Sequence, residues 1–198
     1  MLFAGEEHLP KAEVFAQKIL KMKSIILSLV IFTLFTFSKC KKDVVTTDDN
    51  GLPAATQEGK NTLGFLINGQ AWKPQGFDGS ANLSVDVDFG YNNGIFSLAA
   101  YRITGNDRQA FGIGCDSLNS ITFPTTLKIQ KKSSAQIALS KNPCSIDYFD
   151  TTVLREGVLK INKLDKINHI IAGTFSVTLI KSGCDTFKIT DGRFDMKF

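Results

Sequence analysis

Short runs of alternating apolar and polar residues occupy the chain from residue 61 onward. Between Leu83 and Phe89 every odd position is apolar and every even position is polar, and alternation returns at residues 174–179, 186–190 and 193–198. Successive side chains of a β-strand point to opposite faces, so this pattern indicates strands with one buried and one solvated face. No segment after residue 40 shows a convincing helical period, and we expect this part of the chain to be all β.

Further strand-forming runs bring the expected total to about ten short strands. Turn residues separate them at intervals typical of a sandwich or a barrel. The run from Ile95 to Ile103 has apolar residues at both odd and even positions and is expected to be a central strand covered on both faces. The sequence therefore predicts an all-β domain, an antiparallel β-sandwich or barrel. The remaining expected strands are residues 63–67, 71–72, 110–115, 127–129, 137–139, 146–153 and 158–164.

Two dipeptides carry the turn chemistry of hairpins. Asn68-Gly69 separates two apolar runs and predicts a two-residue hairpin, because both residues tolerate the positive φ that such turns require. Asp191-Gly192 lies between two alternating runs in the same way. It predicts either a second hairpin or a bulge inside one long strand.

The parity of the alternating runs also predicts the core. One apolar side chain in two should point inward, and Phe198 extends this face to the last residue, so we expect the carboxyl end to be held in the sheet. The expected core consists of Leu63, Phe65, Ile67, Trp72, Val85, Val87, Phe96, Leu98, Leu159, Ile161, Phe175, Val177, Leu179, Phe187, Ile189, Phe194 and Met196.

The amino-terminal part of the chain carries a targeting signal. Residues 25–37 form an uncharged apolar run, shorter than the roughly 20 residues that span a bilayer but within the roughly 7–15 residues of a signal-peptide core. Lys21 and Lys23 precede this run, and Cys40 follows it where a peptidase would cut. The site looks like the lipobox of bacterial lipoproteins, in which the cysteine is acylated. It departs from the usual box by having Phe37 and Lys39 at two positions, so a plain secretory peptide or an anchor helix stays as the alternative.

These features divide the chain into four expected parts. Met22 resembles a normal start of a signal peptide, whereas residues 1–21 are polar and carry Glu6, Glu7 and Glu13, so we interpret 1–21 as a gene-model extension. Residues 22–40 are the expected lipoprotein signal peptide. Residues 41–60 are polar, lack periodicity and are expected to be a flexible tether. Residues 61–198 are the expected all-β domain.

Two sequence blocks resemble a known family. The opening block, residues 61–74, reads NTLGFLINGQAWKP, and the closing blocks, residues 173–176 and 189–195, read GTFS and ITDGRFD. They resemble conserved blocks of a family of uncharacterised Bacteroidota lipoproteins, which is known only as a domain of unknown function. The resemblance brackets nearly the whole expected domain, and it implies an outer-membrane location and a β-rich fold but no activity.

The charge of the chain gives no support for nucleic-acid binding, and its cysteines predict a disulfide. The whole chain has a formal charge of +4, but after Cys40 there are 18 Lys or Arg against 16 Asp or Glu, so nothing indicates nucleic-acid binding. Cys115 has the parity of a core residue. Cys144 lies in a turn and Cys184 has the parity of the solvated face, so we predict a Cys144–Cys184 disulfide, with three free thiols as the alternative. A metal site has little support, because there is no C-x-x-C pair and only one histidine follows Cys40.

Few residues of the chain are candidates for catalysis. His169 lies in an expected turn and is interpreted as a solvated histidine. Asp86 and Asp88 are neighbours on one strand face, as a pair of catalytic carboxylates could be, but that face is the expected outer one. Asp195 is flanked by Arg193 and Lys197 and is interpreted as part of a surface ion pair. No nucleotide-binding motif is present, and we assign no catalytic residue, cofactor or metal.

Three functions remain after these exclusions. The favoured one is a lipid-anchored module of the cell envelope, surface-facing or periplasmic, that binds a glycan, a peptide or a partner protein. The candidate contact aromatics are Trp72, Tyr91, Tyr101 and Tyr148, with Trp72 more readily interpreted as core. The second is a structural or assembly subunit of an envelope complex, and the third is a hydrolase of unfamiliar type. The oligomeric state is not predicted.

Overall fold

The structure, a computed structural model, describes residues 47–130 and 135–198. The expected extension, the signal peptide and Cys40 lie outside these described residues. The described part is nearly all β, with a single 3₁₀ turn, η1, at Leu118–Ser120. The strands are β1 Thr62–Ile67, β2 Gln70–Trp72, β3 Leu83–Asp88, β4 Ile95–Thr104, β5 Asp107–Cys115, β6 Thr125–Ile129, β7 Ala135–Lys141, β8 Cys144–Ile146, β9 Leu154–Asp165, β10 Ile170–Ile180 and β11 Phe187–Lys197.

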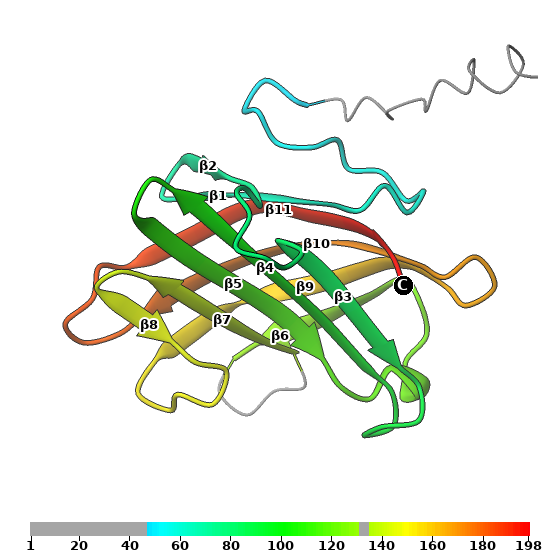
Figure 1. Cartoon of the computed structure of the whole chain (residues 1–198). Helices are drawn as coiled ribbons and strands as arrows, with labels where there is room; N and C mark the ends of the chain where they lie inside the picture. The colour runs from blue at the N-terminus through cyan, green and yellow to red at the C-terminus, as the bar shows by residue number, and fades with distance from the viewer. Residues whose placement is uncertain (1–46, 131–134) are drawn as a thin grey trace, which may run out of the picture. The chain divides into compact units, whose positions relative to one another are not determined.

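All eleven strands belong to one sheet that curls around a single core (Figure 1). The strand order is β2-β1-β11-β10-β9-β6-β7-β5-β4-β3, and β8 pairs with β7 off this path. Neighbouring strands are antiparallel except for β6 and β7, which meet in parallel at Ile129 and Ala135. The all-β prediction is confirmed, and the curled sheet forms a half-barrel.

The concave face of the sheet carries the core. The expected core residues are buried, with two exceptions: Val85 and Val87 of β3 are half-buried. Phe65 lies at the centre of an aromatic cluster, with its ring centroid 4.8 Å from that of Trp72 and 4.5 Å from that of Phe111. Val85 and Val87 are less covered because β3 is the last strand of the sheet and has a neighbour on only one side.

Residues 47–60 lie against the outer face of β1 and β11, although the whole of 41–60 was expected to be a tether. Leu52 is completely buried, and Asp48 forms an ion pair with Arg193 of β11, with 2.8 Å between the charged atoms. A Cβ atom on Gly64 of β1 would collide with Pro53, so the glycine allows this segment to cross the strand closely. The ordered domain therefore begins before residue 61, and the segment is held by specific polar contacts that composition alone does not reveal.

The two turn dipeptides form different structures. Asn68 and Gly69 have φ values of 50° and 81°, and they connect β1 to β2 as the predicted hairpin. Asp191 has a φ of 53° inside the continuous strand β11, where the pairing register with β10 shifts. Of the two alternatives at Asp191-Gly192, the structure has the bulge. Because of the bulge, the inward-facing residues of β11 have odd numbers up to Ile189 and even numbers from Phe194 onward.

Two expected strands differ from the structure. Residues 146–153 were expected to be a strand, but β8 ends at Ile146 and a loop follows. The side chains of Asp147 and Asp150 accept hydrogen bonds from the backbone N–H groups of Phe149 and Thr152, which stabilises turns instead of a strand. The strand expected at 95–103 exists as β4, but Ala99 is exposed, because the single-layered sheet leaves its outer face uncovered.

Cys144 and Cys184 form a disulfide, with 5.8 Å between their Cα atoms. The bond connects the start of β8 to the turn between β10 and β11. Cys115 is a free thiol that points into the core, and burial, with a smaller contribution from Asp116, raises its pKa to about 12. The thiol is therefore a small apolar core group with little thiolate character.

Candidate binding site

The curled sheet is incompletely closed between β1 and β3. At one end of this opening the chain beyond β2 reaches β4, where Gln75 forms an isolated parallel β-bridge with Arg102. At the other end Phe89, directly after β3, contacts Phe198, directly after β11, with ring centroids 6.2 Å apart. We call the opening between these two contacts the seam.

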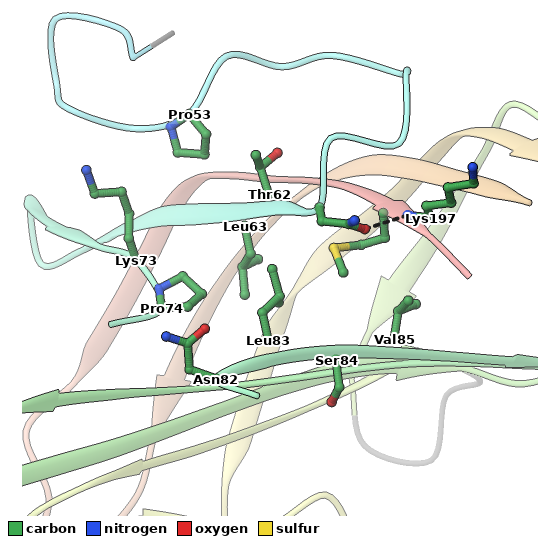
Figure 2. Close-up of a pocket in the computed structure, with 12 residues that line it drawn as sticks. Pro53, Thr62, Leu63, Lys73, Pro74, Asn82, Leu83, Ser84, Val85 and Lys197 are labelled. Atoms are coloured by element: carbon green, nitrogen blue, oxygen red, sulfur yellow. Dashed lines mark hydrogen bonds between the residues drawn. The ribbon is translucent and has the colours of Figure 1, made fainter. Parts of the chain in front are cut away.

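A cavity of about 580 Å³ occupies the seam. Its apolar floor includes Leu63 of β1 and Leu83 of β3, whose side chains point toward each other (Figure 2). Val85 and Met196 extend the floor. The volume of the cavity lies within the range of roughly 300–1,000 Å³ typical of ligand sites. The other described residues that line the cavity are Pro53, Asn61, Thr62, Lys73, Pro74, Asn82, Ser84 and Lys197.

The loop from residue 73 to 82 forms one border of the cavity and is held by hydrogen bonds. The backbone N–H of Ile103 donates to the carbonyl of Gln75 at 2.9 Å. The hydroxyl of Tyr101 donates to the carbonyl of Ser80 at 2.7 Å, and Asp78 forms an ion pair with Arg108. The Arg108 guanidinium is the main reason that the pKa of Asp78 lies below its usual range. These contacts fix the loop, so this border of the cavity is preformed.

The chemistry of the lining favours binding over catalysis. The described residues that line the cavity include no carboxylate, histidine or cysteine side chain. The hydroxyls of Thr62 and Ser84 point away from the floor, as Figure 2 shows. The charged side chains of the lining are Lys73 and Lys197, which lie on opposite sides of the cavity (Figure 2). The site therefore combines an apolar floor with two flanking cations and offers no acid, base or thiol nucleophile.

Most of the candidate contact aromatics are not at the surface. Trp72 is completely buried and donates from its indole N–H to the side-chain oxygen of Gln109 at 2.8 Å. Tyr101 is also buried, and Tyr148 is half-buried over Gly112, where any side chain would collide with its ring. Of the four, Tyr91 is exposed. None of the four lines the seam cavity.

In the described part of the chain, no hydrogen bond or ion pair joins His169, Asp86 and Asp88 to one another. Asp86 and Asp88 are exposed on the outer face of β3, and Asp88 accepts a hydrogen bond from the backbone N–H of Gly90. His169 is in the turn before β10, with a φ of 56°, and its ring contacts that of Phe198. Within residues 47–130 and 135–198, no group of three or more His, Cys, Asp or Glu residues could hold a metal ion.

Asp195 has a structural partner that the sequence did not indicate. It was interpreted as part of a surface ion pair, but it is 1% exposed. Its carboxylate accepts hydrogen bonds from the Thr56 hydroxyl at 2.5 Å and from the backbone N–H groups of Glu58, Gly59 and Lys60 at 3.0, 2.7 and 3.3 Å. Asp195 points to the outer face of β11, as its position in the alternation predicts, but residues 56–60 cover that face. We call this arrangement the Asp195 clamp.

A second charged side chain, Arg155, is also buried. It has the inward parity of β9, and its guanidinium donates to the backbone carbonyls of Asp147 and Asp150 in the loop after β8. Burial lowers the pKa of Arg155, and the charges of Asp147 and Asp150 partly oppose this effect. A cavity of about 210 Å³ lies beside it, but both terminal nitrogens are committed to the loop, so we interpret Arg155 as the residue that holds the loop in place.

Comparisons of the chain with protein-family models, with curated proteins and with solved structures find no match. The resemblance to Bacteroidota lipoproteins therefore stays a prediction. None of the helices among the described residues is long and apolar enough to cross a membrane.

Proposed function

We propose that this chain is a lipid-anchored binding module of the cell envelope, and that it binds a segment of a peptide or partner protein in the seam. The observation that carries the proposal is the cavity of about 580 Å³, with an apolar floor and a hydrogen-bonded border. Ligand pockets in proteins are mostly apolar with a few placed polar groups, which is the composition found here.

A peptide or protein ligand fits the seam better than a glycan does. Aromatic side chains often supply the flat contact surface for a sugar ring, and the described residues that line the cavity contain no aromatic side chain. They contain leucine, valine, methionine and proline, which suit apolar side chains. The hydrolase alternative loses support for a separate reason, because the lining supplies no pair of carboxylates or nucleophile with a base.

The binding proposal is tested by selecting ligands and then closing the cavity. The purified full-length chain in detergent is used to select binders from a displayed library of random twelve-residue peptides. Val85→Arg places a cation over the apolar floor, and we expect it to weaken binding of the selected peptides by about tenfold or more. The matched control is Val158→Arg on the outer face of β9, where the valine is exposed. Peptides that bind both variants equally, or a library that yields no binder, would contradict the proposal.

The lipid anchor is tested separately at Cys40. With Cys40→Ala we expect the protein to lose incorporation of a labelled fatty acid and to leave the membrane fraction, because a thioether-linked lipid supplies most of the membrane affinity. Cys115→Ala serves as the control cysteine and should leave both labelling and fractionation unchanged. A Cys40→Ala protein that still carries label in the membrane fraction would overturn the assignment of the anchor.

A further inference from the structure

We propose that the seam binds its ligand by β-strand addition, with an extended peptide lying along the free edge of β3 and acidic residues on both of its flanks. This inference rests on the proposed function and specifies the ligand class of the same site.

The backbone of β3 leaves hydrogen-bonding groups free on the side of the seam. The backbone N–H of Tyr101 in β4 donates to the carbonyl of Asn82 at 3.0 Å, which identifies these two residues as a hydrogen-bonded pair. In an antiparallel ladder, bonded pairs recur every second residue. The backbone groups of Ser84 therefore face β4, whereas those of Leu83 and Val85 face the seam. No strand among the described residues pairs with this edge of β3.

The opposite side of the seam presents a shorter free edge. Ile67 pairs with Gln70 of β2 across the two-residue hairpin turn, and Phe65 pairs with Trp72 two residues further along. The pair that closes such a turn is hydrogen-bonded, so the backbone groups of Ile67 and Phe65 face β2. By the same alternation, the backbone N–H and carbonyl of Leu63 point to that side of β1, beyond the last paired residue of β2. A strand in the seam would gain backbone partners mainly from β3, and one further partner residue from β1.

The half-buried state of β3 supports the same conclusion. The inward residues of the neighbouring strand β4, such as Phe96 and Leu98, are 1% and 0% exposed. Val85 and Val87 have the same inward parity but are half-buried, because no strand lies beside them in the seam. A peptide strand there would place every second side chain over Leu63 and Met196 and would complete the burial of β3.

The charge of the lining selects acidic flanks for the ligand. Lys73 and Lys197 lie on opposite sides of the cavity, and the described lining contains no acidic side chain. Both ammonium groups point away from the floor in Figure 2, so carboxylates at the two ends of a bound peptide would meet them at the rim of the cavity. The peptide positions opposite Asp86 and Asp88 would not be acidic, because like charges on neighbouring strands repel. Exposed pairs of this kind contribute little free energy each, so they favour acidic flanks without replacing the apolar contacts.

A second copy of the chain fits this edge less well than a foreign peptide. If two β3 strands paired along their free edges, Asp86 and Asp88 of both copies would lie on the same face of the joined sheet. Like charges at neighbouring cross-strand positions are destabilising. We therefore assign the edge to a peptide of different sequence.

The test uses a synthetic twelve-residue peptide from the selection described above, chosen because Val85→Arg weakens its binding by about tenfold or more. Amide hydrogen exchange of the full-length chain is followed by NMR with and without this peptide. We expect exchange at Leu83, Val85 and Val87 to slow by about tenfold or more, because these amides gain partners. The amides of Ser84 and Asp86 already bond to β4 and should change little. Methylation of alternate backbone nitrogens of the peptide should weaken its binding.

The charge requirement has its own variant. Lys73→Glu combined with Lys197→Glu should weaken an acidic selected peptide by about 2- to 10-fold at low salt and remove most of the salt dependence of its binding. Unchanged affinity in this variant would overturn the assignment of acidic flanks. Binding that depends on Val85 but leaves exchange at Leu83, Val85 and Val87 unchanged would overturn strand addition while leaving the proposed function intact. Dimerisation through β3 without peptide would assign the edge to a second copy and also overturn the inference.

Discussion

Replacing Asp195 by alanine is expected to lower the free energy of unfolding by about 3–5 kcal/mol, because four donors lose a buried charged acceptor and recover only part of that free energy by bonding to water. The buried carboxylate connects β11 to Thr56, Glu58, Gly59 and Lys60. Without it, residues 56–60 lose their main polar attachment to the sheet. Urea denaturation measures the loss in free energy, and amide exchange at residues 58–60 locates it.

The matched variants separate the charge of Asp195 from its shape. Asp195→Asn keeps one acceptor oxygen and should lose less stability than Asp195→Ala. Asp185→Ala removes an exposed carboxylate from the turn before β11 and should change stability by less than about 0.5 kcal/mol. An Asp195→Ala protein as stable as the wild type would show that the Asp195 clamp does not hold residues 56–60 to the sheet.

The contribution of Asp195 should also depend on pH in a defined direction. Burial alone would raise its pKa, but the hydrogen bonds from Thr56, Glu58, Gly59 and Lys60 outweigh burial and lower the pKa below the ordinary value of 3.8. A carboxyl group whose pKa is lower in the folded state adds stability at pH values above its unfolded pKa. That stability disappears as the pH falls through the folded pKa. The difference between wild type and Asp195→Asn should therefore be full at neutral pH and shrink below about pH 4.

Removing the Cys144–Cys184 disulfide is expected to lower the free energy of unfolding by about 2–4 kcal/mol, since a cross-link over a long loop restricts the unfolded chain. The two cysteines are 40 residues apart in the sequence. The bond also holds β8, which pairs only with β7 in the described sheet, to the turn between β10 and β11. The double variant Cys144→Ser with Cys184→Ser, denatured in urea, measures the effect.

Reduction supplies the control for this prediction. A reducing agent should destabilise the wild type by about as much as the double substitution does, and it should not change the double variant. A thiol reagent should react slowly with Cys115 of the native wild type, because this side chain is buried and its pKa is raised. Equal stability of the wild type with and without reductant would show that the bond contributes nothing measurable.

The strands and the core follow from local sequence because the period of two is a property of the strand itself. Leu63, Phe65 and Ile67 share a face whichever strand lies beside them, and their burial was predicted correctly. The turn at Asn68-Gly69 was predictable for the same reason, since it requires only two residues with positive φ. Strand parity also predicted the pairing of Cys144 with Cys184, which are bonded in the structure.

Tertiary structure decided where the strand edges meet. Pairing of β1 with β11, or of β6 with β9, joins residues far apart in the sequence, and no local period encodes that choice. The seam exists because the sheet curls without a strand between β1 and β3, so its lining residues had no shared sequence signal. Lys73 and Lys197 become neighbours of one cavity only through this arrangement.

The choice between bulge and hairpin at Asp191-Gly192 was likewise made by the partner strand β10, because both solutions suit the dipeptide equally. For Asp195, the alternation of β11 determined that the carboxylate points outward. Whether it met water or the N–H groups of residues 58–60 depended on a polar segment distant in sequence folding over it, and a buried carboxylate persists only where such donors converge.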